Sequence, residues 1–239
     1  MKTCIITQAR CGSSRLPRKI LKKIGEKTLL EIHLERLKKV SKAEAIIVAT
    51  TFEYGSEEIL EIAERSGVQA FQGSTEDVLD RYWQAAMKME PDAVVRVTSD
   101  CPLVDPETID SMIKIFETED FDYLANTQPP TFPDGMDVEI FTLDALGKAW
   151  SGATNPKDRE HVTHYFYTHP DLFRIGAHRC EQDRSSLRLT VDYEEDYLVI
   201  ADLVSRFGAE RSWEFYADEL EKNPALARIN NMRARNEGF

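Results

Sequence analysis

Short runs of β-branched and apolar residues alternate with helical patterns through the first half of the chain. The runs favoured as strands lie at residues 3–7, 45–51, 68–71 and 93–98. Between and after them, apolar residues recur at helical spacing, which predicts helices over 30–37, 79–86 and 109–116, the last opened by Pro106. This alternation is typical of βαβ units, so we expect an α/β fold with a mostly parallel sheet.

The second half of the chain continues these elements less regularly. Further strands are expected at residues 123–125, 138–141, 172–177 and 187–191, and helices near 158–168, 194–206 and 214–222. The Pro-rich stretch 126–135 is followed at once by a strand pattern, so a loop or subunit contact is favoured over a domain boundary. We therefore expect one domain over 1–239, with a twisted sheet between two helical layers. Within this domain, an inserted segment at about 126–175 would bind the acceptor or form a dimer contact.

Charge is distributed unevenly along the chain. The net charge of −12 disfavours nonspecific binding to nucleic acid or to an anionic membrane. Residues 1–27 nevertheless contain eight Lys or Arg against a single Glu, a local charge of +7, so the remainder carries −19. An acidic chain with one basic segment indicates a small polyanionic ligand bound near that segment.

Apolar runs and cysteines exclude several classes of protein. The longest uninterrupted apolar runs contain five residues, whereas a membrane-spanning helix needs about 20. No secretory signal pattern is seen, so we expect a cytoplasmic protein. The cysteines form no CxxC pair and are too scattered for a zinc site or a disulfide framework.

The basic segment 10–19 follows directly on the first predicted strand, at the carboxyl end where parallel sheets bind ligands. Its small residues expose backbone N–H groups to phosphate oxygens, and its Arg and Lys side chains neutralise charge. No two glycines stand closer than five positions, so a GxGxxG fingerprint does not occur. A Walker P-loop is also missing, because the one GxxxxG pattern, Gly147 to Gly152, is followed by Ala153 and Thr154 instead of Lys. We expect a phosphate-binding loop of another kind; the alternative is a solvated basic loop.

The string from Ala9 to Lys19 resembles the ARxGSxRLPxK motif of cytidylyltransferases that make CMP-activated acidic sugars. Segments 73–82 and 96–103 narrow the resemblance to the branch of spore coat polysaccharide biosynthesis protein F, and 134–139 with 159–163 extend it. The resemblance implies a nucleotide-diphospho-sugar transferase-like fold and a homodimer. It also implies an enzyme that uses CTP and Mg²⁺ to transfer CMP to a small acidic acceptor, with release of pyrophosphate.

The resemblance also assigns residues to the nucleotide. The residues implied in binding CTP are Ala9, Arg10, Gly12, Ser13, Lys19, Ser74, Asp77 and Arg81, and those implied in catalysis are Arg10, Arg15, Lys19 and Asp100. Ser74, Asp77 and Arg81 are the expected contacts to cytosine and ribose. A structural alternative exists for Ser74 and Asp77, because their spacing resembles a capping box at a helix start.

Two carboxylates are expected to hold the metal. Asp100 follows the strand 93–98 and Asp192 follows the predicted strand 187–191, and both match metal-binding positions of the resembled family. Two such carboxylates suit Mg²⁺, which offsets charge on a departing pyrophosphate. Asp100 could instead be an ordinary turn residue, and Asp192 could instead cap the helix that begins at Glu194.

The acceptor site is expected between about 134 and 175. Its candidates are Asp134, Asp137, Glu139, Arg159, Glu160 and His161. Arg159 and His161 could bind an acidic substrate, or they could lie on a solvated helix start. His161 and His164 have metal-chelating spacing, but no third ligand at convincing spacing supports zinc.

We therefore expect a CTP-dependent cytidylyltransferase that acts in surface polysaccharide biosynthesis. A nucleotide-sugar glycosyltransferase is one alternative, for which Asp120-Phe121-Asp122 matches the bare Asp-x-Asp pattern. A nucleotide-binding protein without catalysis is another, although it would not need both Asp100 and Asp192. The acceptor itself is left open: a modified ulosonic acid, a phosphonate or a phosphorylated small molecule all suit an acidic site.

Overall fold

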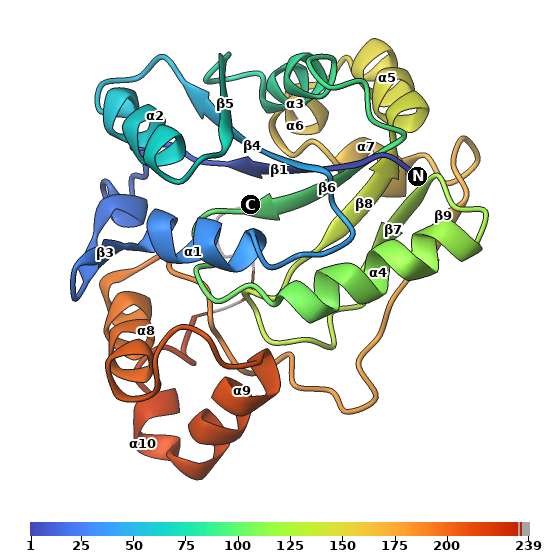
Figure 1. The fold of residues 1–239 in the computed structure, drawn as a ribbon. Coiled ribbons are helices and arrows are strands. Elements are labelled where there is room, and N and C mark those ends of the chain that lie inside the picture. The colour runs from blue at the N-terminus through green and yellow to red at the C-terminus, as the bar shows by residue number, and fades with distance from the viewer. Residues whose placement is uncertain (234, 236–239) are drawn as a thin grey trace.

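A seven-stranded sheet forms the centre of the computed structural model, which describes residues 1–233 and 235 (Figure 1). Its strand order is β5-β4-β1-β6-β8-β7-β9. The strands are β1 (Thr3–Gln8), β4 (Ala45–Thr51), β5 (Gln69–Gly73), β6 (Ala93–Thr98), β7 (Tyr123–Ala125), β8 (Glu139–Thr142) and β9 (Ile175–Ala177). Neighbouring strands pair in parallel except where β8 meets β6 and β7, so the expected mostly parallel sheet is confirmed.

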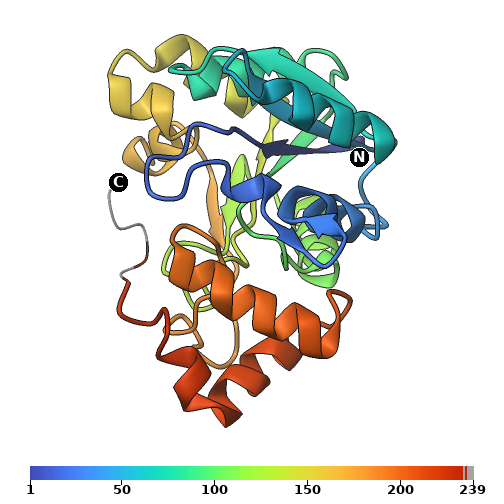
Figure 2. The ribbon, with the colours of Figure 1, turned by 90° about the vertical axis from the view of Figure 1, so that its left-hand side faces the viewer.

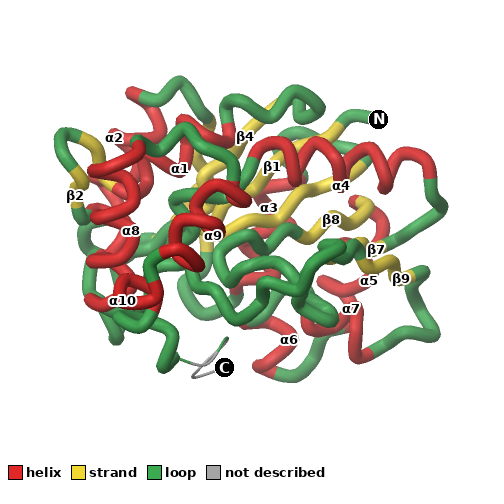
Figure 3. The backbone as a smooth tube through the Cα atoms, turned by 90° about the horizontal axis from the view of Figure 1, so that it is seen from below, coloured by secondary structure: helices red, strands yellow, loops and turns green. Residues whose placement is uncertain are grey.

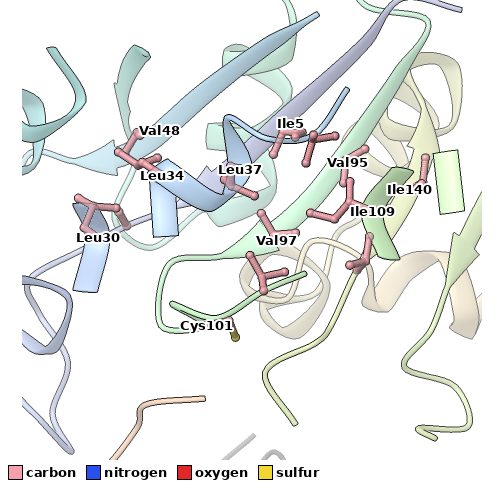
Figure 4. Packing of buried hydrophobic residues seen from close by; sticks show 14 of the residues in the cluster. Ile5, Leu30, Leu34, Leu37, Val48, Val95, Val97, Cys101, Ile109 and Ile140 are labelled. Atoms are coloured by element: carbon pink, nitrogen blue, oxygen red, sulfur yellow. The ribbon is translucent and has the colours of Figure 1, made fainter. Parts of the chain in front are cut away.

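Helices cover both faces of this sheet. One face carries α1 (Leu29–Leu37), α2 (Ser56–Arg65) and α4 (Pro106–Thr118), and the other carries α3 (Val78–Ala86), α5 (Leu143–Gly152) and α7 (His164–Thr168). Alternate side chains of each strand serve the two layers: Ile5 packs with the first set, and Cys4 and Ile6 pack with the second. Figure 4 shows Ile5 and Val48 near the leucines of α1, and Val95 beside Ile109 of α4, in the first layer.

A third helical group lies beyond the sheet. It contains α8 (Glu194–Phe207), α9 (Trp213–Lys222) and α10 (Pro224–Ala227), which form a separate block at the bottom of Figure 2. Seen from below in Figure 3, this block lies near α1 and one end of the sheet. Its core includes Leu29 and Ile32 of α1, together with Leu189 and Val191.

The remaining elements are short. A two-stranded ribbon joins β2 (Lys23–Ile24) to β3 (Lys27–Thr28), the 3₁₀ helix η1 spans Lys19–Leu21, and α6 spans Pro156–Glu160. Helix starts follow the local chemistry: Thr28 and Glu31 form a capping box on α1, and Asp105 caps α4 just before Pro106. Among the described residues, no helix is long and apolar enough to cross a membrane.

Three expectations about elements were wrong. Residues 187–191 form no strand; they contact the sheet region through a bridge between Asp134 and Arg188 and through the Val191 N–H, which donates to the Asp100 carbonyl at 2.8 Å. The helix expected over 158–168 is divided into α6 and α7, because Val162 adopts a left-handed φ of 46° that no helix continues through. The strand expected over 172–177 is confined to Ile175–Ala177. Helices α2 and α5 were not predicted.

Candidate active site

A cleft of about 1090 Å³ lies at the carboxyl ends of the parallel strands β1 and β6. All the predicted site residues line it except Gly12 and Ser74, which lie in the adjoining loops. The lining comes from the loop after β1, the start of α3, the end of β6, residues 134–139, α6 and Asp192. Segments more than a hundred residues apart in the sequence therefore meet at one sheet edge, as the topology rule for parallel sheets requires.

The basic loop after β1 is held by its own backbone. Ser13 and Arg18 donate N–H bonds to the Cys11 carbonyl at 3.0 and 3.1 Å, and Arg18 adopts a left-handed φ of 57°. Gly12 lies close to the Glu53 side chain, since a Cβ at this position would lie 2.7 Å from a carboxylate oxygen of Glu53 unless that side chain moved. The tight turn places Arg15 and Lys19 at the cleft.

The Lys19 ammonium lies between the two predicted metal carboxylates. It donates to Asp100 Oδ2 at 2.7 Å and to Asp192 Oδ1 at 2.8 Å. Burial opposes the charge of Asp100, but Lys19 beside it lowers the pKa of this carboxyl below its ordinary value. Burial likewise opposes the charge of Lys19, while the two carboxylates raise its pKa, so this group stays an ammonium. The structure thus brings together the three charges that the sequence had placed far apart.

The carboxylate of Asp192 does not cap helix α8. Its oxygens accept bonds from Lys19, from Arg15 Nη2 at 2.7 Å and from Arg188 Nη2 at 2.9 Å. The helix start is served instead by Asp196, whose Oδ2 accepts the backbone N–H groups of residues 192 and 193 at 2.9 and 3.0 Å. The alternative role of Asp192 as a helix cap was therefore wrong.

The oxygen donors at this point fit Mg²⁺. Asp100 and Asp192 converge on one cation, and carboxylate oxygens are the ligands that this metal prefers. Within residues 1–233 and 235, no three His, Cys, Asp or Glu side chains are grouped to hold a metal ion. A magnesium ion at this point would therefore complete its shell with phosphate oxygens and water, as it commonly does.

Arg188 is a buried hub that sequence reasoning missed. Its guanidinium donates to Asp134 at 2.5 Å, to Asp192 at 2.9 Å and to both oxygens of Asp196 at 2.8 and 3.1 Å. Only 4% of its side chain is exposed. Burial acts to lower the pKa of Arg188, but the bonds to the carboxylates raise it above its ordinary value. An Arg inside the apolar alternation 187–191 was the signal available in the sequence.

A second group of carboxylates, those of Asp134, Asp137 and Glu139, lines the part of the cleft where the sequence predicts the acceptor. Antiparallel pairing of β8 with β6 sets Glu139 opposite Arg96, and the two side chains form an ion pair. Tyr123 Oη donates to Glu139 at 2.5 Å. Asp137 lies nearby; its burial, with the negative charges of Asp134 and Glu139, raises its pKa to about 7.

This raised pKa gives a testable dependence of stability on pH. Folded Asp137 keeps its proton up to about pH 7, whereas the unfolded chain releases it near pH 4, so the contribution of this group to stability falls as pH rises through that window. The free energy of unfolding of Asp137→Asn, relative to that of the wild type, should therefore rise by about 1 kcal/mol or more between pH 5 and pH 8. Urea unfolding at the two pH values measures the gain; parallel stability curves would contradict the assignment.

The residues expected to contact cytosine and ribose form local hydrogen bonds in the segment before α3. Asp77, and not Ser74, is the N-cap of α3 and accepts the Asp80 N–H at 2.8 Å. Ser74 Oγ accepts the Asp77 N–H at 3.0 Å, and Arg81 donates to the Ser74 carbonyl at 2.5 Å. Nucleotide contacts by these residues stay a prediction. Arg81 is 2% exposed and lines the cleft, and its Nε has no hydrogen-bond partner among the described residues.

The residues of α6 also line the cleft. Arg159 donates to Asp77 Oδ2 at 2.9 and 2.5 Å and to the Trp150 carbonyl at 2.6 Å, so it connects α6 with the start of α3. Glu160 and His161 lie on the cleft wall, and burial lowers the pKa of His161. The expected acceptor contacts of these residues stay predictions; a solvated helix start does not describe Arg159.

Comparison with known proteins agrees with the fold and the family. SpsF, the spore coat polysaccharide biosynthesis protein of Bacillus subtilis (strain 168), is 34% identical over 85% of this chain and 86% of its own length. The 3-deoxy-manno-octulosonate cytidylyltransferase 2 of Hydrogenovibrio crunogenus is 34% identical over 72% and 74%. A solved cytidylyltransferase from Leptospira borgpetersenii serovar Hardjo-bovis is 37% identical, with a TM-score of 0.91 over 100% of this chain and 99% of that one.

The sequence model of the cytidylyltransferase family covers the sheet, the cleft and most of the third helical group. It matches residues 4–222, which include all the predicted site residues. The sheet with its flanking helices is also the fold of solved nucleotidyltransferases. This chain belongs to the cytidylyltransferase family, and it is a nucleotidyltransferase.

Proposed function

We propose that this protein transfers CMP from CTP to an acidic sugar or a related acidic acceptor, with Mg²⁺ as cofactor, for surface polysaccharide biosynthesis. The observation that carries the proposal is the convergence of Asp100 and Asp192 on the Lys19 ammonium, beside a glycine turn that bears Arg10 and Arg15. This arrangement supplies paired carboxylates for a divalent cation next to cationic groups for a triphosphate.

The reaction follows from these charges. An acceptor hydroxyl oxygen forms a bond to the α-phosphorus of CTP, the bond from that phosphorus to the bridging oxygen breaks, and pyrophosphate leaves with its electron pair. The hydroxyl proton passes to solvent. Arg10, Arg15 and Lys19 neutralise the triphosphate, and the backbone at Gly12 and Ser13 cradles it. Mg²⁺ held by Asp100 and Asp192 would offset charge on the departing pyrophosphate.

The acceptor class is supported by the relatives and by the cleft. The relative from Hydrogenovibrio crunogenus is named for 3-deoxy-manno-octulosonate, an acidic sugar, and that from Bacillus subtilis for a polysaccharide. The cleft beside residues 134–139 carries arginines that can pair with an acid. The proposal includes the homodimer implied by the family resemblance, which light scattering of the full chain measures.

The Asp120-Phe121-Asp122 motif does not support the glycosyltransferase alternative. Asp120 and Asp122 both pair with Arg174, Asp122 at 2.9 Å. They precede β7, and they are absent from the described lining of the cleft. A metal motif for sugar transfer should face the nucleotide, so these two carboxylates do not favour that reaction.

Nucleotide choice tests the proposal. CTP with Mg²⁺ should raise the melting temperature more than UTP, GTP or ATP at equal concentration, since a ligand that binds the folded state stabilises it by RT ln(1 + [L]/Kd), which grows as Kd falls. Pyrophosphate release from CTP is then measured against a panel of acidic sugars, phosphonates and phosphorylated sugars. Equal shifts with all four nucleotides, or none with CTP, would overturn the cytidylyl assignment.

The basic loop gives a second test with a matched control. Arg15→Ala and Lys19→Ala should each weaken CTP binding about tenfold or more, because a hydrogen bond to a charged group contributes about 1.5–3 kcal/mol. Lys23→Ala removes the same charge from an exposed side chain in β2 and should bind CTP like the wild type. Isothermal titration of CTP measures all three variants. A comparable loss in Lys23→Ala would show that the basic segment acts only through its total charge.

A further inference from the structure

The described residues after α10 lie beside the cleft. After α10, residues 228–233 and 235 form what we call the C-terminal arm, which leaves the α8–α10 block at the red end of the ribbon in Figure 2. Sequence analysis assigned this segment no role. Its contacts lie on the same residues that hold the predicted metal carboxylates and the acceptor side of the cleft.

The arm is anchored on the Arg188 hub. Asn230 is 2% exposed, and its amide donates to the Arg188 carbonyl at 3.3 Å and to Asp196 Oδ1 at 3.0 Å. Arg233 lies 4.0 Å above the Tyr193 ring and pairs with Glu195 at 3.4 Å. These bonds fix the direction of the arm along the segment that carries Asp192.

The same tyrosine connects the arm to the phosphate-binding loop. The Arg15 guanidinium lies 5.4 Å from the centre of the Tyr193 ring, which Arg233 also contacts. Cations over an aromatic face are attracted to it. The arm therefore approaches the cleft from the side of Asp192. Its Arg233 shares the Tyr193 ring with Arg15 of the phosphate-binding loop.

Arg235 brings this arm to the acceptor side. Its guanidinium donates to the Phe132 carbonyl at 3.1 Å and forms an ion pair with Asp137. Only 14% of its side chain is exposed. Asp137 lines the cleft, so this ion pair lies at the cleft wall.

Three arginines pair with the carboxylates at 134–139. Arg188 is bonded to three carboxylates and is 4% exposed, and Arg96 is held within the sheet opposite Glu139. Arg235 has one described carboxylate partner, Asp137. Because Asp137 lines the cleft and Arg235 is not among the described lining residues, Arg235 can act on a bound acid only through Asp137.

We propose that Arg235 is a positioning residue that sets acceptor specificity: it neutralises ionised Asp137 at the cleft wall, so that an acid can bind there. This inference rests on the proposed function. Asp134, Asp137 and Glu139 would repel an anion at this wall if their charges were not offset. Arg188 pairs with Asp134, Arg96 pairs with Glu139, and Arg235 offsets the remaining charge, that of Asp137.

The test uses the full chain with a matched control on the same arm. Arg235→Gln and Arg235→Lys are compared with Arg228→Gln, which removes the same charge from an exposed position at the base of the arm. Rates are measured at pH 8, where Asp137 with its pKa of about 7 is mostly ionised, with CTP, Mg²⁺ and the acid of the panel that gives the fastest pyrophosphate release. The KM for that acid should rise about tenfold to a hundredfold in Arg235→Gln and less in Arg235→Lys.

The same measurements separate specificity from general support of the fold. The KM for CTP and the melting shift produced by CTP should change less than twofold in every variant, and Arg228→Gln should match the wild type throughout. An unchanged KM for the acid in Arg235→Gln, or an equal rise in the KM for CTP, would overturn the inference alone. If the wild type binds CTP but uses no acid of the panel, the proposed function fails and the inference fails with it.

Discussion

Asp100→Asn and Asp192→Asn are each expected to lower turnover about a hundredfold or more, while the protein stays folded. Asn keeps the size of the side chain but loses the charge that a divalent cation requires. In each variant, Lys19 retains the other carboxylate, at 2.7 or 2.8 Å. Pyrophosphate release is measured against Mg²⁺ concentration, and excess Mg²⁺ should restore part of the lost rate.

Glu194→Gln is the matched control for these two variants. Glu194 is exposed, begins α8 only two residues after Asp192, and pairs with Lys22 at 2.7 Å. Glu194→Gln therefore removes a negative charge that pairs with Lys22 and leaves both carboxylates bonded to Lys19 in place. Turnover near the wild-type value in Asp192→Asn at low Mg²⁺ would remove Asp192 from the metal site and leave Asp100 as the remaining candidate.

Arg188→Leu should cause the largest loss of stability. The substitution leaves Asp134, Asp192 and Asp196 without the guanidinium that they share, and one of them, Asp196, is 0% exposed. Breaking a buried ion pair by removing one partner costs about 3–5 kcal/mol. For a chain of this length, that corresponds to a fall of roughly 6–20 °C in melting temperature.

Calorimetry of the ligand-free protein measures this loss. Arg206→Leu provides the comparison, because Arg206 pairs with Asp202 on the exposed side of α8, with 48% of its side chain exposed. An exposed pair of this kind contributes about 0–1 kcal/mol. Similar melting temperatures for the two variants would mean that the hub holds the cleft residues in place without stabilising the fold.

The first half of the fold could be predicted because its strands are buried on both faces. Runs such as 45–51 and 93–98 are then mostly apolar and β-branched, and they are recognisable without knowledge of their partners. Helix α2 escaped prediction because its first turns are acidic and its core contacts are few, Ile59, Ile62 and Ala63 being the buried apolar residues.

The error at 187–191 has a different cause. Leu187, Leu189 and Val191 do alternate, and they pack toward the third helical group while Arg188 faces the carboxylates. The backbone is thus correctly interpreted as extended. A strand also needs a neighbour with which to form a hydrogen-bonded ladder, and that neighbour depends on residues far away in the sequence.

The candidate site was predictable only in part for the same reason. The acidic and basic residues of the cleft could be located from the family motifs and from the ends of strands. Their partners could not, because Arg188 and Arg235 reach Asp134 and Asp137 across 54 and 98 residues of sequence. Which cation neutralises which carboxylate is decided by tertiary packing, for which single-sequence patterns carry no signal.

The reversed direction of β8 has a consequence for how this site can diversify. The cleft uses residues that follow β1 and β6, but at β8 it uses the residues that precede the strand, since β8 runs the opposite way. Replacements or insertions at 126–138 would therefore remodel one wall of the cleft, whereas those just after β8 would fall at the far edge. Under the proposed function, the acceptor wall and the phosphate-binding loop are thus separate segments, joined by Arg188, which bonds to both Asp134 and Asp192. An exchange of loop 126–138 between relatives that keeps Asp134 is therefore a rational route to altered acceptor use.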